Sequence, residues 1–208
     1  MNDIREGTET VRPRRSLATY LLSGLALIGA VAALYVIVHP HSKPGAAGEL
    51  HSLARGEMKG LSTASAGAPS PTTPFIDAEG RTVRLDQLKG RILVINLWAT
   101  WCAPCVREMP TLAKLQLAYP GKILVVPISM DKAGDREKAR AFIAGDPPLP
   151  FYQDEASAMP FALTPAAEGF PTTVIYGADG REKARVSGDA DWSGADAHAV
   201  FDALTKGG

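Results

Sequence analysis

The chain has 208 residues, of which 46% are hydrophobic and 21% charged, and its 22 basic and 22 acidic residues give a formal net charge of zero. These values exclude a wholly disordered or collagen-like chain and argue against nucleic-acid binding, which usually brings a basic excess. The length suits one domain with an appendage, and two cysteines allow one disulfide but no tetrathiolate zinc site.

Residues 17–38 form an apolar run without a charged residue. At ~1.5 Å per helical residue the run spans about 33 Å, enough to cross a bilayer core of about 30 Å. It is longer than the apolar region of a cleavable signal peptide, and only Ala46-Ala47-Gly48 follows as a weak cleavage site. We therefore expect an uncleaved transmembrane anchor, with a cleaved signal peptide or a buried soluble helix as alternatives.

The charges that flank this run predict its orientation. Three arginines between residues 12 and 15 precede the run, whereas only Lys43 follows it closely. Because basic flanks stay on the cytoplasmic side, we expect residues 1–16 in the cytoplasm and the chain after Val38 outside. In a bacterium this means a single-pass protein of the inner membrane whose main domain faces the periplasm, where disulfides are permitted.

Residues 39–73 are rich in Gly, Ala, Ser and Pro, a composition typical of a linker. Within them, apolar residues approximate helical spacing at Leu50, Leu53, Ala54, Met58 and Leu61. We expect a short helix here, packed on the domain or, alternatively, binding a partner.

Residues 74–208 alternate between strand and helix patterns. In chain order we expect a hairpin at 75–85 turning at Glu79-Gly80, a short helix between Asp86 and Gly90, a buried strand at 92–97, a helix at 103–119, a buried strand at 123–128, a helix at 136–144, strands at 172–176 and 182–187, and a closing helix at 194–206. This order predicts an α/β domain with a mixed sheet flanked by helices.

The two cysteines lie in Cys102-Ala103-Pro104-Cys105, directly after a buried strand and at the start of a helix. The two-residue gap lets both sulfurs meet across the first helical turn, where the positive end of the helix dipole favours a thiolate. Cys102 is closer to that end, so we expect it to be the nucleophile and Cys105 to resolve the mixed disulfide. Pro104 suits a first turn because its missing amide has no intrahelical use there.

A metal half-site and a purely structural disulfide are the alternatives for this pair. Three of the four histidines lie in the linker and the fourth is His198 in the last helix, so we expect no metal site. A structural disulfide usually closes a longer loop. Redox chemistry is therefore the favoured interpretation.

Residues 96–110 (NLWATWCAPCVREMP) resemble the active-site segment of the thioredoxin superfamily. Together with the hairpin and residues 169–175 (GFPTTVI), the pattern over 74–208 is similar to membrane-anchored, periplasm-facing thioredoxins, above all TlpA-like proteins and next the respiratory cytochrome-maturation thioredoxins. The resemblance implies a thioredoxin fold and thiol–disulfide oxidoreductase activity. For TlpA-like proteins it also implies reduction of copper-site assembly proteins for cytochrome oxidase.

The resemblance also implies roles for individual residues. The buried aspartate of cytosolic thioredoxin falls at Asn96, which cannot act as a base, and TlpA-like proteins carry a glutamate where this chain has Glu108. Glu108 lies one turn beyond Cys105, so we expect it to handle protons for the resolving step. The alternative is an ordinary glutamate that favours the helix dipole.

A client-binding surface is expected beside the cysteines, formed by Trp101, Pro104, Phe170 and Pro171. Trp101 should shape the surface next to Cys102 while Trp98 packs inward, although either could be a plain core residue. The resemblance places a cis proline at Pro171, opposite the cysteine pair, and leaves the backbone of Phe170 free to pair with an extended client segment. The alternative is a trans proline that merely starts the strand.

We expect the protein to reduce disulfides in exported clients, and the resemblance implies a membrane-embedded thiol reductase as the electron donor. The chain carries no nicotinamide or flavin motif, so no cofactor beyond a redox-active Cys102–Cys105 disulfide is expected. The alternatives are a thiol oxidant, a copper metallochaperone that uses the cysteine pair, and a tethered adaptor.

Overall fold

The computed structural model describes residues 46–206. The expected cytoplasmic segment and the anchor at 17–38 lie outside these residues. Between residues 46 and 206, no helix is long and apolar enough to cross a membrane.

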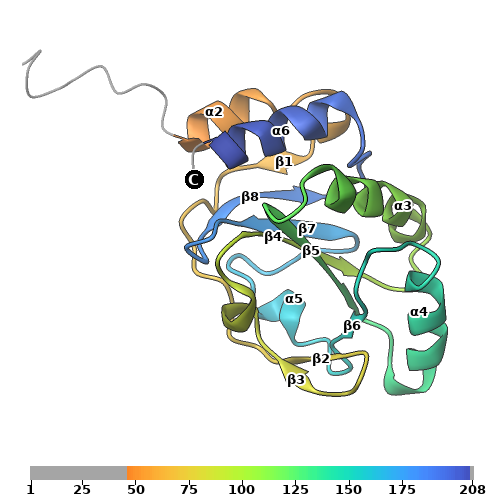
Figure 1. Cartoon of the computed structure of the whole chain (residues 1–208). Helices are drawn as coiled ribbons and strands as arrows, with labels where there is room; N and C mark the ends of the chain where they lie inside the picture. The colour runs from red at the N-terminus through yellow and green to blue at the C-terminus, as the bar shows by residue number, and fades with distance from the viewer. Residues whose placement is uncertain (1–45, 207–208) are drawn as a thin grey trace, which may run out of the picture. The chain divides into compact units, whose positions relative to one another are not determined.

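The described part of the chain forms an eight-stranded sheet in the order β1-β8-β7-β4-β5-β6-β2-β3 (Figure 1). Its strands are β1 (Leu61–Ser62), β2 (Phe75–Asp77), β3 (Thr82–Val83), β4 (Ile92–Trp98), β5 (Ile123–Ser129), β6 (Tyr152–Gln153), β7 (Thr172–Tyr176) and β8 (Glu182–Ser187). β4 pairs in parallel with β5 and antiparallel with β7, so the predicted mixed sheet of a thioredoxin fold is confirmed.

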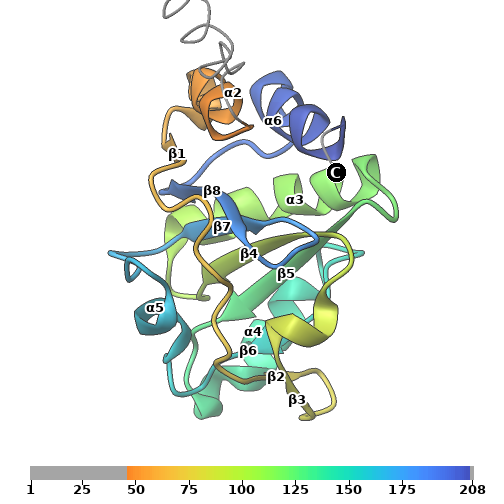
Figure 2. The same ribbon diagram turned by 90° about the vertical axis from the view of Figure 1, so that its left-hand side faces the viewer.

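Helices flank this sheet. They are α2 (Ala46–Ser52), α3 (Ala103–Ala118), α4 (Arg136–Ile143), α5 (Met159–Ala162) and α6 (Ala195–Lys206), with 3-10 turns η1 (Gly56–Met58), η2 (Leu85–Leu88) and η3 (Ala133–Asp135). α6 lies beside α3, and α2 lies beside α6 (Figures 1 and 2). The Tyr119 hydroxyl, just after α3, donates to Asp202 of α6 at 2.9 Å and joins the two helices.

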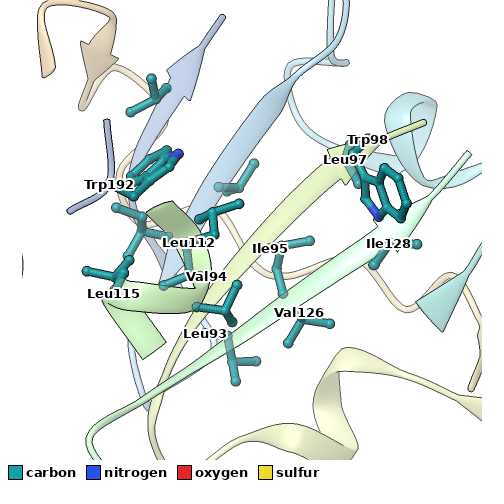
Figure 3. Packing of buried hydrophobic residues seen from close by; sticks show 14 of the residues in the cluster. Leu93, Val94, Ile95, Leu97, Trp98, Leu112, Leu115, Val126, Ile128 and Trp192 are labelled. Carbon is teal, nitrogen blue, oxygen red and sulfur yellow. The ribbon is translucent and has the colours of Figure 1, made fainter. Parts of the chain in front are cut away.

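The core is centred on β4, whose residues from Leu93 to Trp98 are all buried. Leu112 and Leu115 of α3 and Trp192 pack on one side of this strand, and Trp98 lies at its far end (Figure 3). A strand that is apolar on both faces is the kind that helices cover on both sides. Packing around β4 therefore fixes the strand end from which the cysteine motif emerges.

The long elements agree with their sequence predictions to within about two residues, whereas the short β1, β6 and α5 were missed. The expected helix across Leu50–Leu61 is wrong in extent, because α2 ends at Ser52. Gly56 follows with a φ of +51°, a left-handed conformation that a continuing helix does not tolerate. The apolar residues beyond it are used in η1 and β1 instead.

The described part of the expected linker packs on the domain. Leu61 of β1 pairs with Val186 of β8, and Leu50, Met58 and Leu61 are buried. Residues 46–73 thus belong to the same compact unit as the sheet, which begins earlier than Pro74.

Candidate active site

The two cysteines lie at the junction of β4 and α3, where they form a disulfide. Cys102 is the N-cap of α3, and its Sγ accepts a hydrogen bond of 3.3 Å from the backbone amide of Cys105. Cys102 is 6% exposed and Cys105 is fully buried. This inequality agrees with Cys102 as the attacking group, a role that stays a prediction.

In the reduced protein, Cys102 should react with iodoacetamide at least about tenfold faster than Cys105 at pH 7. The helix N-terminus raises its thiolate fraction, and the smaller burial raises its access. Alkylation followed by mass spectrometry measures both rates in one sample. The single variants Cys102→Ser and Cys105→Ser serve as controls. Equal rates, or a faster Cys105, would reverse the assignment of roles.

A buried aspartate holds the loop between β4 and the cysteines. The carboxylate of Asp131 accepts hydrogen bonds from the backbone amide of Thr100 at 2.9 Å, from the Thr100 hydroxyl at 2.8 Å and from the Ser129 hydroxyl at 2.8 Å. Sequence reasoning missed Asp131. The sequence feature that could have identified it is an aspartate two residues after the buried strand β5. The C-terminal end of β5 lies beside that of β4, from which the cysteine motif follows.

Glu108 lies one turn beyond Cys105 on α3 and is 2% exposed. Its Oε1 accepts a bond of 2.7 Å from Asn96 Nδ2, and its Oε2 accepts from the amide of Ala190 at 3.2 Å and from Trp192 Nε1 at 3.1 Å. Burial raises the pKa of Glu108 from 4.5 to about 7, although these three donors lower it. The alternative of an ordinary helix-dipole glutamate is wrong, because such a residue would face solvent near the helix start.

Asn96 of β4 joins Glu108 of α3 to the neighbouring strand β7. Its Nδ2 also donates to Thr173 Oγ1 of β7 at 2.8 Å, while its Oδ1 has no partner among the described residues. Thr173 and Trp192 were missed from the sequence, because nothing local marks a polar contact between segments so far apart. Asn96, Glu108, Thr173 and Trp192 form a polar cluster inside the sheet–helix interface.

A cavity of about 420 Å³ opens to this cluster from the side of β8. Glu108 and Thr111 of α3 line it together with residues 186–187 of β8 and 189–191 of the following loop. The cavity lets solvent approach a carboxyl group that is otherwise buried.

The surface beside the disulfide is aromatic. Trp101 is 63% exposed, and its ring lies 5.8 Å from that of Phe170 in an edge-to-face arrangement. Trp101 is therefore not a core residue, whereas Trp98 is fully buried as predicted. Pro104 lies half-buried in the first turn of α3, between the cysteines.

The Phe170–Pro171 bond is cis, which confirms the predicted geometry. Because Thr172 pairs with Leu97 near the end of β4, Pro171 lies at the same end of the sheet as the cysteine motif. Pro171 itself is buried, whereas the half-buried Phe170 forms the edge-to-face ring pair with the exposed Trp101. The client-binding role of these residues stays a prediction.

A disulfide of the CxxC type ahead of α3, on this sheet and beside a cis proline, defines a thioredoxin-like thiol:disulfide oxidoreductase. A Redoxin family model matches residues 64–201, and the chain belongs to this family. It is 39% identical over 77 residues to the thioredoxin-like protein YneN of Bacillus subtilis, covering 36% of this chain and 45% of YneN. It is 30% identical over 125 residues to the thiol-disulfide oxidoreductase ResA of Geobacillus thermodenitrificans, covering 59% of this chain and 69% of ResA.

A solved structure of a DsbF homologue from Corynebacterium diphtheriae shares the fold, with a TM-score of 0.57 and 25% identity over 66% of this chain and 87% of that one. These similarities place the chain among TlpA-like thioredoxin-fold thiol:disulfide oxidoreductases. The alignment with YneN spans less than half of that protein. The direction of electron transfer and the identity of the client proteins are therefore proposed below.

Proposed function

We propose that this protein reduces disulfides in exported client proteins while it is tethered to the bacterial inner membrane with its domain in the periplasm. The observation that carries the proposal is the Cys102–Cys105 disulfide, in which Cys102 is 6% exposed and Cys105 is fully buried, one turn from a buried glutamate. The apolar run at 17–38 and its basic flank support the tether.

The reaction begins with the reduced protein. The Cys102 thiolate attacks one sulfur of a client disulfide, so that the client S–S bond breaks, a mixed disulfide forms and the other client sulfur leaves as a thiolate. Cys105 then gives its proton to the Glu108 carboxylate and attacks Cys102 Sγ. This step closes the Cys102–Cys105 disulfide and releases the second client thiolate, so two electrons have passed to the client.

Regeneration needs two electrons from a membrane-embedded thiol reductase. Reduction is the direction that suits an oxidising compartment, in which cysteine pairs destined for copper or haem would otherwise stay oxidised. Clients that assemble copper sites of cytochrome oxidase or mature cytochrome c fit this requirement. The opposite direction, oxidation of client thiols, and copper carriage by the cysteine pair are the competing functions.

Client trapping tests the proposal. The full-length Cys105→Ser variant, expressed in bacterial membranes, should accumulate mixed disulfides that dithiothreitol releases, because the resolving thiol is missing. The double variant Cys102→Ser/Cys105→Ser is the matched control and should trap nothing. In cells without the protein, the trapped clients should accumulate in the oxidised form.

Two results would contradict the proposal. Absence of thiol-sensitive adducts would exclude exchange, and clients that accumulate in the reduced form would favour the oxidant instead. Anaerobic titration of the reduced protein with Cu(I) separates copper carriage from exchange.

A further inference from the structure

The backbone of the loop between β8 and α6 is attached to the site at two points. Its first residue, Gly188, donates its amide to the carbonyl of Pro171 at 3.0 Å, and it has a φ of +91°, a left-handed conformation that favours glycine. Further along the loop, Trp192 donates its amide to Thr111 Oγ1 at 3.1 Å. The Thr111 hydroxyl in turn donates to the carbonyl of Glu108 at 2.7 Å. The loop is thus attached both to the cis proline and to α3.

The same loop supplies two of the three hydrogen-bond donors to the Glu108 carboxyl group. The amide of Ala190 and the indole Nε1 of Trp192 both donate to Oε2. Trp192 is fully buried, and its ring packs against Phe201 of α6 with centroids 6.4 Å apart. Its indole therefore has little freedom to leave the carboxyl group.

We propose that residues 188–192 are a positioning element for Glu108, in which Trp192 Nε1 and the Ala190 amide hold Oε2 and set the pH range over which the carboxyl group exchanges its proton. The consequence for disulfide exchange rests on the proposed function, in which Glu108 takes the proton of Cys105.

The charges around Glu108 agree with this role. Burial raises the pKa of Glu108, the bond from Trp192 opposes this rise more than those from Asn96 and Ala190, and the nearby Asp189 carboxylate adds to it. Besides Glu108, the charged groups that line the cavity are Glu57, Lys59, Arg107, Asp189 and Asp191. The loop thus carries both a donor that favours the ionised form and a carboxylate that disfavours it.

Trp192→Phe should raise the midpoint of Glu108 ionisation by about one pH unit, because it removes a hydrogen bond to the charged form and keeps an aromatic ring. Asp189→Asn should lower the midpoint by a few tenths of a unit, because it removes a like charge and frees Arg107, which pairs with Asp189 at 3.2 Å.

The measurement uses the oxidised full-length protein in detergent micelles, with glutamate labelled at the side-chain carboxyl carbon. Carbon NMR across pH 4 to 9 gives the midpoint, and the Glu108 signal is assigned by its loss in Glu108→Gln. Trp98→Phe is the matched control. Its indole is equally buried, and its Nε1 has no partner among residues 46–206, so this variant should leave the midpoint unchanged.

A midpoint that does not move in Trp192→Phe, or that moves equally in Trp98→Phe, would overturn the proposal. If Trp192→Phe does not fold, Asp189→Asn decides, since its side chain is 49% exposed and not part of the core, and an unmoved midpoint there counts against the positioning role. A midpoint that shifts while the pH profile of client reduction stays fixed would support the positioning role and contradict proton transfer to Glu108 in the proposed function.

Discussion

Glu108→Gln should make the oxidised protein more stable relative to wild type as the pH rises, by on the order of 3 kcal/mol between pH 4 and pH 8. The cause is the raised pKa of Glu108, which is about 7 in the folded protein against an ordinary value of 4.5. A buried carboxyl group is tolerated while it is neutral, and its ionisation in the folded state is disfavoured.

The sign follows from the order of the two pKa values. Below pH 4.5 the carboxyl group is neutral in both states, so the contribution of its raised pKa to stability is fully present. Between 4.5 and 7 the unfolded chain loses its proton first, and the folded protein becomes progressively less stable. Glutamine does not titrate and escapes this loss.

Urea unfolding of both proteins at a series of pH values measures the effect, since every other titrating group cancels in the difference. Glu137→Gln, at an exposed position on α4, is the matched control, because it makes the same substitution outside the core. A difference between Glu108→Gln and wild type that stays flat from pH 4 to 8 would contradict the raised pKa.

The same variant should also slow the resolving step. A carboxylate that accepts the Cys105 proton contributes in the range of general base catalysis, so we expect a loss of about 100-fold at pH 8 and no inflection near pH 7. Stopped-flow release of a client thiolate from the mixed disulfide measures this step. An unchanged pH profile would leave Glu108 with a structural role only.

The sequence predicts those parts of the site that depend on local order. The spacing of Cys102 and Cys105 after an apolar strand is enough to place both sulfurs at a helix start, and the resemblance adds the cis bond before Pro171. The partners of Glu108 could not be predicted in this way. Trp192 lies 84 residues from Glu108, and Thr173 lies 77 residues from Asn96, so no periodic pattern links them.

Residues 46–73 show a second limit of sequence reasoning. Their Gly, Ala and Ser content is that of a linker, yet Leu50, Met58 and Leu61 are buried in the core of the domain. Composition averages over a stretch, whereas docking depends on single residues such as Met58 and Leu61. A short edge strand such as β1 depends on its pairing with β8, which local propensity does not report.

Asn96→Asp should reduce the free energy of unfolding by about 3 kcal/mol at pH 8, and by much less at pH 4. Asn96 is fully buried, and its Nδ2 donates to Glu108 Oε1 at 2.7 Å. Aspartate would replace this donor with a second acceptor and a like charge. At low pH both carboxyl groups are protonated and can share a hydrogen bond, so the cost falls.

Thr173→Val is the matched control for this variant. It removes the other partner of the Asn96 amide without adding a charge, so it should cost about 1 kcal/mol at every pH. Denaturant unfolding of the three proteins at pH 4 and pH 8 separates the two effects. If Asn96→Asp were as stable as wild type at pH 8, the coupling between these positions would be refuted.

An amide at position 96 can present its NH₂ to a carboxylate or its carbonyl to a carboxylic acid, so Asn96 can hydrogen-bond to Glu108 in both ionisation states. An aspartate at this position, as the resemblance gives for cytosolic thioredoxin, would compete with Glu108 for the same proton.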